Sequence, residues 1–480
     1  MFKLITAPAS ITESSVALIW ERVGNGEYTI YQNGNRLTET STSAYTVSGL
    51  FADSEYEFYI SCGGERSNSV TVKTLPIPQI FNITDYGARS GELCTCSIQA
   101  AIDACCEGGV VVIPEGTFIS GALFLKSDMT LEVNGTLLGS DNPSDYPVFS
   151  YRFEGYEAPC YASLINTADG AHRNITIRGN GCINANGKAL KPKETEAKFG
   201  RAICIRSTDG VYLKDITVRQ APFWCIEPIY CRGISLDNIK LHTKYDENGE
   251  LYAMCNCDGF DPDSCRDVYV FNSLLSSQDD CIALKSGRDR EGREVGIPTE
   301  NVLITDCVFK SGFGVACGSE MSGGVRNVLV RDCVFDNVYS IGSVKAPRGR
   351  GGVIENVRYE RCVLKNLSTE HYDCEWFRGG IYVDYFYSHK EFNPDEVLPV
   401  DDSTPAIRNI TFEDIELETV AGNAIFICGL GESPAENITL KNVSAKGKFG
   451  LKAFNVNGLK LDNVSVTAEN GEDIELVNCN

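Results

Sequence analysis

A short pattern that recurs through the C-terminal part of the chain is the sequence feature that most constrains its fold. An asparagine is followed by an apolar, a variable and an apolar residue, then by a polar pair, and then by an apolar residue or cysteine. Copies are spaced by roughly 21 to 36 residues, with one gap of about 53, and such a period is typical of the coils of a solenoid. The copies begin at Asn174, Asn301, Asn327, Asn356, Asn409 and Asn437, with variants at Gly210, Gly233, Asp267 and Gly458.

The repeats align a column of small or apolar residues. Cys307, Cys333 and Cys362 each lie six residues after their repeat asparagine. The other copies carry Ser273, Ile239, Ile415, Val443 or Val464 at this place. Stacking of such inward-pointing residues predicts an all-β domain, a right-handed parallel β-helix, and it explains several cysteines without disulfides. The sequence shows neither a blade-length period nor lipid-facing alternation, which disfavours a propeller or a transmembrane barrel.

The first 76 residues predict a separate small β-sandwich. Short strands alternate with turns, and Asn33-Gly34 is a hairpin signal between two of them. Leu50 with Tyr56 resembles the tyrosine corner of fibronectin type III modules. We therefore expect a fibronectin-like domain over 1–76 and a β-helix domain over 77–480; an irregular extension of the main fold is the alternative. The strands are expected at Ser15 to Trp20, Tyr28 to Gln32, Ala44 to Val47, Tyr56 to Cys62 and Ser69 to Lys73.

The second domain begins with a single helical pattern. Apolar residues recur at helical spacing from Ser97 to Cys106. A helix here is expected to cap the open end of the sheets and to protect their edges.

Three carboxylates lie close together in the repeats. Asp258 belongs to an Asn-Cys-Asp-Gly-Phe-Asp run, and Asp279 and Asp280 to the stretch 278–287. Asp258 and Asp280 are 22 residues apart, about one coil, so they can stack at the spacing of neighbouring strands. Asp279 reaches the same cleft only if the strand bulges there. Crowded carboxylates split their pKa values, as paired acid and base chemistry requires; two solvated acidic turns are the alternative.

These two segments resemble the signature of glycoside hydrolase family 28, the polygalacturonase family, and the resemblance covers roughly residues 81 to 480. It implies hydrolysis of α-galacturonosyl bonds with inversion. By this resemblance Asp279 is the general acid, and Asp258 and Asp280 position and deprotonate the attacking water. An inverting pair of carboxyl groups is typically about 6.5–9.5 Å apart, which leaves room for that water.

Two motif positions depart from the family pattern. The usual Gly-His-Gly reads Gly312-Phe313-Gly314, and the usual Arg-Ile-Lys reads Ser343-Val344-Lys345. Lys345 matches the lysine that binds the sugar carboxylate. Phe313 can stack on a sugar face, and Arg348 or Arg350 can supply the forked carboxylate contact that Ser343 lacks.

The departures leave three alternatives open. These are a glycosidase for a neutral or rhamnogalacturonan-type sugar, a sugar-binding solenoid without activity, and a pectate-lyase-like eliminase that uses calcium. An insertion over 289–294 resembles exo-acting members and favours cleavage from one chain end. Further residues expected to line the cleft and bind substrate are Asn256, Trp224, Glu227, Trp376 and Arg378.

Composition narrows the partners. A net charge of −22 argues against nucleic acid or an anionic membrane surface as a partner. The family resemblance implies an oligosaccharide substrate as the partner. The cysteines at 255, 257 and 265 lack a second ligand pair with zinc-like spacing, so we expect no metal and no cofactor. The 21 cysteines and the absence of a recognisable secretory signal favour a reducing, cytoplasmic compartment, with secretion as the alternative. The oligomeric state stays open.

Overall fold

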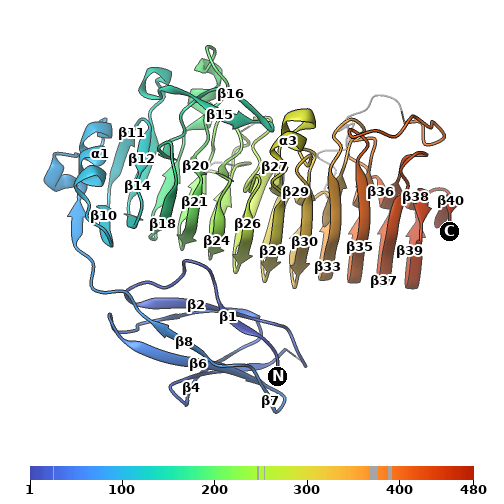
Figure 1. Ribbon diagram of the computed structural model, residues 1–480, viewed down its shortest axis with the longest axis horizontal. Coiled ribbons are helices and arrows are strands. Elements are labelled where there is room, and N and C mark those ends of the chain that lie inside the picture. The colour runs from blue at the N-terminus through green and yellow to red at the C-terminus, as the bar shows by residue number, and fades with distance from the viewer. Residues whose placement is uncertain (25, 246–247, 253, 367–376, 388–391) are drawn as a thin grey trace.

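The computed structural model describes residues 1–480 except 25, 246–247, 253, 367–376 and 388–391. Figure 1 shows coils of parallel strands that follow one another from the blue N-terminal end to the red C-terminal end, with a small sheet domain beside them. The right-handed parallel β-helix and the small N-terminal β-domain expected from the sequence are thus both present.

The N-terminal domain consists of two antiparallel sheets around Trp20, Tyr28 and Phe58. Strands β2 and β3 have the predicted bounds, and β1, β4 and β7 were not predicted. The Tyr56 hydroxyl accepts a hydrogen bond from the Phe51 backbone N–H at 2.9 Å, as in a tyrosine corner; the fibronectin type III assignment itself stays a prediction. One sheet contains β1 (Leu4–Thr6), β2 (Ser15–Trp20) and β5 (Ala44–Ser48), and the other β3 (Tyr28–Gln32), β4 (Asn35–Thr40), β6 (Glu55–Cys62), β7 (Glu65–Arg66) and β8 (Val70–Lys73).

The β-helix has three parallel faces. The first holds β9 (Ile80–Asn82), β10 (Gly109–Ile113), β13 (Met129–Val133), β18 (His172–Arg178), β21 (Thr208–Lys214), β24 (Arg232–Asp237), β26 (Arg266–Phe271), β28 (Thr299–Thr305) and β30 (Val325–Arg331). The second holds β11 (Thr117–Ser120), β14 (Thr136–Gly139), β19 (Cys182–Asn184), β22 (Thr217–Arg219), β25 (Lys240–His242) and β31 (Val334–Asp336). The third holds β12 (Leu123–Leu125), β17 (Ile165–Thr167), β20 (Ile203–Arg206), β23 (Ile226–Ile229), β32 (Gly342–Lys345), β34 (Gly379–Asp384), β36 (Asn423–Cys428), β38 (Phe449–Asn457) and β40 (Ile474–Cys479).

Long strands bend around a corner and serve two faces. β27 (Leu274–Leu284) and β29 (Val308–Cys317) belong to the second and third faces. The first and second faces share β33 (Val353–Asn366), β35 (Ala406–Thr419), β37 (Ala435–Gly447) and β39 (Lys460–Ala468).

The backbone conformation explains why asparagine recurs in the repeat. Asn327 and Asn356 adopt φ of 57° and 56°, in the left-handed region that asparagine tolerates better than other non-glycine residues. Their side-chain amides also form a ladder from coil to coil, in which Asn356 donates to Asn327 at 3.2 Å and Asn327 donates to Asn301 at 3.3 Å. The glycine variants of the repeat at 210, 233 and 458 have positive φ as well, which explains why they can replace asparagine.

The predicted column lies in the core. Cys362 is in register with Ile415, which is in register with Val443, and all three are buried. Most of the cysteines that the structure describes are buried, in agreement with the interpretation of buried cysteines as small apolar residues. The reducing compartment stays a prediction.

Helices are few and short. The predicted capping helix is α1 (Thr95–Ala104), whose buried Ile98, Ala101 and Ile102 join the β-helix core. Helices α2 (Gly187–Leu190) and α3 (Asp289–Val295) were not predicted, because so few residues show no clear periodicity. Within the described residues, no helix is both long and apolar enough to span a membrane. The 3₁₀-helices are η1 (Ile83–Tyr86), η2 (Pro143–Asp145) and η3 (Lys191–Lys193).

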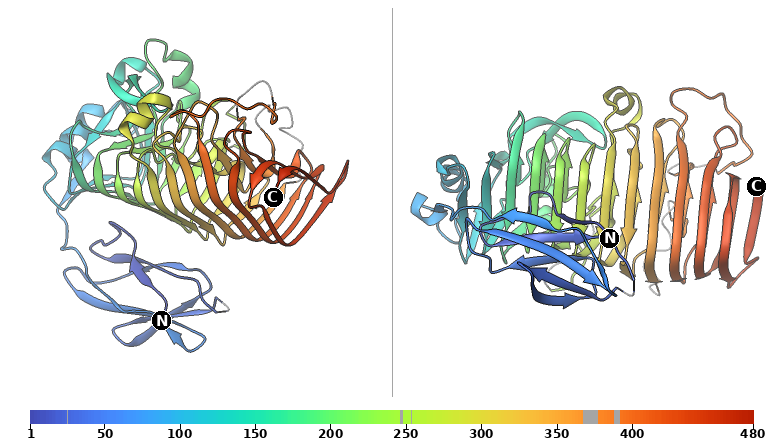
Figure 2. Two further views of the ribbon diagram at one scale, coloured as in Figure 1. Left: turned by 45° about the vertical axis from the view of Figure 1, so that its right-hand side comes forward. Right: turned by 60° about the horizontal axis from the view of Figure 1, so that its bottom comes forward.

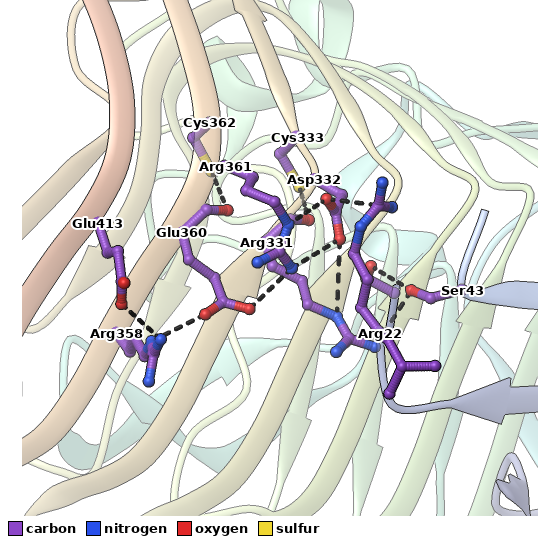
Figure 3. Close-up of polar contacts among 12 residues, drawn as sticks. Arg22, Ser43, Arg331, Asp332, Cys333, Arg358, Glu360, Arg361, Cys362 and Glu413 are labelled. Carbon is purple, nitrogen blue, oxygen red and sulfur yellow. Dashed lines mark hydrogen bonds and ion pairs between the residues drawn. The ribbon is translucent and has the colours of Figure 1, made fainter. Parts of the chain in front are cut away.

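The N-terminal domain packs against the first face of the β-helix (Figure 2). Arg331 of β30 is buried there, and its guanidinium donates to the Trp20 carbonyl at 2.7 Å and to Ser43 Oγ at 3.1 Å. Figure 3 shows Arg22 of the N-terminal domain beside Asp332, 3.3 Å between the charged atoms. These contacts join residues about 300 positions apart, so they fix the domain on the β-helix.

We expect Arg331→Met to lower the free energy of unfolding by about 2–3 kcal/mol, because it removes the charged hydrogen bonds to the buried Trp20 carbonyl and to Ser43. Chemical denaturation, followed by tryptophan fluorescence, measures the change. Arg36→Met is the control, since Arg36 is exposed and pairs with an exposed Glu39, so its loss should cost at most about 0.5 kcal/mol. Equal effects of the two substitutions would contradict the role of Arg331.

Candidate active site

A bulge in β27 brings the three predicted carboxylates together. The register of β27 on β29 shifts between Leu275 and Asp280, and Asp280 then lies opposite Phe313. The coil before it places Phe260 opposite Ile282, which sets Asp258 one coil away from Asp280. Both sequence expectations, the stacking of two carboxylates and the bulge beside them, are met.

The three carboxylates form one cluster. One oxygen each of Asp258, Asp279 and Asp280 lies within 4.8 Å of the others. Asp258 and Asp280 are buried, and Asp279 is half-buried. Burial and the charge of Asp279 raise the pKa of Asp258 well above its usual value, and burial together with Asp280 raises the pKa of Asp279. A cluster of this kind holds a proton to a higher pH than an isolated aspartate does.

Lys345 pairs directly with one of these carboxylates. Its Nζ lies 2.7 Å from Asp280 Oδ2, and the lysine is only 3% exposed. The ring centroid of Tyr387 is 4.8 Å from Nζ and that of Phe313 is 6.0 Å away. Burial works to lower the pKa of Lys345, but Asp280 and the two neighbouring tyrosines raise it well above its usual value. The ammonium charge of Lys345 therefore stays in the site, beside Asp280.

Lys285 is a second buried cation that the sequence analysis gave no role. It lies at 3% exposure between Glu320, at 3.2 Å, and Asp258, at 3.6 Å. Burial works to raise the pKa of Glu320, but Lys285 and Arg350 hold it at about 2. The strand pattern contains a signal for Lys285, because Ile282 and Leu284 point into the core and residue 285 must then point outward.

Two ion pairs near the cluster are fully buried. Arg152 Nη1 lies 2.8 Å from Asp263 Oδ1, and both side chains are fully buried. Arg201 Nε lies 2.5 Å from Glu227 Oε2, and burial raises the pKa of Glu227 to about 7 against the pull of Arg201. Glu227 was predicted to line the cleft for substrate; the structure places it, fully buried, against Arg201.

The structure places the predicted arginines in ion pairs with protein carboxylates. Arg348 Nε lies 2.8 Å from Glu432, and Arg378 Nε lies 2.9 Å from Asp384. Arg350 Nη1 lies 2.6 Å from Asp289, and its Nε donates to the Ser319 carbonyl at 3.0 Å. These ion pairs are with carboxylates other than the triad, and substrate binding by the arginines stays a prediction.

The other predicted residues differ in their placement. Trp224 is buried beneath Lys285, with Nζ 3.9 Å from the ring centroid. Asn256 is exposed with φ of 54° and so forms part of the turn that leads to Asp258. Trp376 lies outside the described residues.

Aromatic side chains surround the two departures from the family pattern. Phe313 stacks on Tyr339 at a centroid distance of 4.4 Å, with 8% of its surface exposed. Ser343 is buried in β32, in register with Ala316 on one side and Tyr382 on the other. The positions of the family histidine and arginine therefore lie in an aromatic corner beside Lys345.

The cluster is tighter than expected for inversion. The nearest carboxylate oxygens lie within 4.8 Å, whereas inverting pairs of carboxyl groups are typically about 6.5–9.5 Å apart. The three residues come from one bulged strand and the coil beside it, and the spacing of parallel strands, about 4.8 Å, sets their separation.

The comparisons with known proteins identify the family. A model of the family described as "Glycosyl hydrolases family 28" matches residues 108–468. The chain belongs to glycosyl hydrolase family 28. An exo-poly-α-D-galacturonosidase from Dickeya chrysanthemi is 26% identical over 95% of this chain and 94% of its own. A probable polygalacturonase from Vitis vinifera is 28% identical over 70% of this chain and 67% of its own. The protein is therefore a glycoside hydrolase.

Solved structures of family 28 enzymes share the fold. A family 28 exopolygalacturonase from Yersinia enterocolitica superposes with a TM-score of 0.78 at 22% identity, over 99% of this chain and 98% of that chain. An exopolygalacturonase from Thermotoga maritima gives a TM-score of 0.62 at 23% identity, over 83% and 91% of the two chains. The first superposition includes the N-terminal domain, because it spans nearly the whole chain.

Proposed function

We propose that this family 28 protein hydrolyses galacturonate polymers and oligosaccharides from one chain end, with inversion at the sugar carbon. Asp279 acts as the general acid that protonates the leaving oxygen. Asp280, paired with Lys345, deprotonates the attacking water, and Asp258 helps to hold that water. The observation that carries the proposal is the buried cluster of three carboxylates, in which, among the residues that the structure describes, only Asp280 has a cation within 3 Å.

Two observations support this assignment of roles. The raised pKa of Asp279 keeps its proton available for the leaving group. The close Lys345 ammonium stabilises the negative charge that a base needs. Action at one chain end is supported by the exo-acting relatives and by the hairpin of β15 (Val148–Phe153) and β16 (Tyr156–Tyr161), which meets α3 through Glu157 N–H and Glu291 Oε1 at 2.9 Å.

Product analysis tests the proposal. Galacturonan and rhamnogalacturonan oligosaccharides are incubated with the native protein, and the products are separated by chromatography. We expect single saturated galacturonate units from galacturonan, without the ultraviolet absorbance of an unsaturated product. A ladder of intermediate lengths would contradict exo action, and an unsaturated product would show elimination instead.

The anomer released first decides the stereochemistry. Proton NMR during the first turnovers should show the β-anomer of the new reducing end, because a single displacement inverts the α-linkage. The α-anomer would mean that the tight carboxylate spacing supports a double displacement with a covalent intermediate.

A further inference from the structure

Lys285 is enclosed by carboxylates. At the third-face end of β27 its Nζ lies 3.2 Å from Glu320 Oε2, 3.6 Å from Asp258 Oδ2 and 3.8 Å from Asp261 Oδ1. The side chain is only 4% exposed, so its charge acts within the protein rather than on solvent. The roles proposed above for the triad and Lys345 leave this cation unused.

A line of aromatic rings joins Lys285 to the β15–β16 hairpin. The ammonium lies 3.9 Å from the centroid of Trp224. Trp224 stacks on Phe223 at 4.9 Å, and Phe223 stacks on Phe153 at 4.3 Å. Since Phe153 is the last residue of β15, the rings connect the tip of the hairpin with the cation beneath the triad.

A line of alternating charges joins the same two places. Glu320, which pairs with Lys285, lies 3.9 Å from Arg350 Nη2, and Arg350 Nη1 lies 2.6 Å from Asp289. Asp289 begins α3 and accepts a hydrogen bond from the Tyr156 hydroxyl of β16. Figure 1 shows the hairpin above the coils, extending to α3. Both lines therefore meet at Lys285.

We propose that Lys285 is a positioning residue whose charge favours the ionised form of Asp258 and holds this carboxylate at a set place relative to the β15–β16 hairpin. The inference rests on the proposed function, because it concerns the carboxylate that holds the attacking water. Lys285 acts through Asp258 by charge, at a distance at which an opposite charge shifts a carboxyl pKa by about 1–3 units. Its charge opposes the rise in the pKa of Asp258 that burial and Asp279 cause.

Lys285→Met tests the inference, since methionine has a similar length and no charge. Without the cation the pKa of Asp258 rises further, so the acidic limb of kcat/KM should move up by about 1–3 pH units. Below that limb we expect a loss of roughly tenfold for each unit of the shift. Lys285→Arg keeps the charge and should keep the limb in place. Lys310→Met is the matched control, because it removes an exposed lysine on β29 that pairs with Asp336.

The far end of the charged line provides a second variant. Asp289→Asn weakens the hold on Arg350 and should shift the acidic limb in the same direction by a smaller amount. An unmoved limb in Asp289→Asn, beside a moved limb in Lys285→Met, would overturn the link to the hairpin. A loss of activity in Lys285→Met that is equal at every pH would overturn the positioning role itself.

The test can be separated from that of the proposed function. Infrared titration of the carboxyl band, with the spectrum of Asp258→Asn subtracted, reports the pKa of Asp258 without turnover. A native protein inactive on galacturonan would contradict the proposed function, and the infrared comparison would still decide on Lys285. An equal titration of Asp258 in the native protein and Lys285→Met would overturn the inference.

Discussion

Asp279→Asn is expected to lower kcat on galacturonan by about 10²–10⁴-fold, because the amide cannot donate a proton to the leaving oxygen. Asparagine has almost the same shape as aspartate, so the position of the substrate should change little. Removing the charge of Asp279 also removes one cause of the raised pKa of Asp258. Steady-state kinetics with the native protein and the variant, together with calorimetric binding of a short oligogalacturonide, separate chemistry from binding.

The leaving group distinguishes the general acid from the base. An aryl galacturonide with a strongly acidic phenol leaves without protonation, so Asp279→Asn should lose much less activity on it than on galacturonan. Asp280→Asn should lose equally on both substrates, because water activation is needed in either case. Asp336→Asn is the control and should be fully active, because Asp336 is half-exposed and pairs with Lys310 on the surface. Equal losses of the two site variants on the aryl substrate would assign the acid to another residue.

The pH dependence has a defined sign. The raised pKa of Asp279 means that the acid keeps its proton above the usual aspartate value of about 3.9. The basic limb of kcat should therefore lie at higher pH than that value, and it should disappear in Asp279→Asn. Of the two histidines in the described residues, His242 has a pKa that burial lowers, and His172 bonds the Ala168 carbonyl at 3.0 Å. A carboxyl group rather than a histidine is therefore expected to set the basic limb.

Local patterns predicted much of this fold. The bounds of β2 and β3 follow from apolar alternation next to a two-residue turn, because strand and turn signals there agree. The repeat asparagines predicted the solenoid, since each coil needs one residue in the left-handed region and Asn301, at φ of 58°, can adopt it. The repeat spacing also gives the length of one coil. Asp258 and Asp280 are 22 residues apart, about that length, so they were predicted to stack.

Contacts between distant parts of the chain could not be predicted in this way. Arg331 meets Ser43 across 288 positions, and no local pattern records that pairing. The same holds for Arg348, which resembles a substrate ligand in sequence but meets Glu432 once the coils stack. Lys285 was part of a recognised motif, yet its role depends on Glu320 and Asp258, which lie on the two neighbouring coils.

Lys345→Met is expected to be the second most damaging substitution in the site. It leaves the buried Asp280 without the ammonium 2.7 Å away, and breaking such a pair typically costs about 3–5 kcal/mol. Asp280 then lacks the cation beside it and activates water less well. We expect kcat/KM on galacturonan to fall by roughly 10²–10⁴-fold, the contribution that general acid–base catalysis usually makes.

The raised pKa of Lys345 determines how the stability loss in Lys345→Met depends on pH. The pKa of Lys345 is raised in the folded protein, so its contribution is complete below the unfolded value of about 10.4 and is lost only as the pH rises through the folded pKa. The destabilisation of Lys345→Met should therefore be nearly constant from neutral pH up to about pH 9. Urea unfolding at several pH values measures this destabilisation. Lys452→Met is the control, because Lys452 on β38 is more exposed and pairs with Glu475.

A double-mutant cycle decides whether Lys345 acts through Asp280. If the lysine works by keeping Asp280 ionised, Lys345→Met should cost little more activity once Asp280→Asn is present, because the charge that it serves is gone. Fully additive losses would mean instead that Lys345 contributes mainly by binding the sugar carboxylate. Lys345→Arg keeps the charge and should retain part of the activity, whereas equal activity of the Arg and Met variants would contradict both roles of the ammonium.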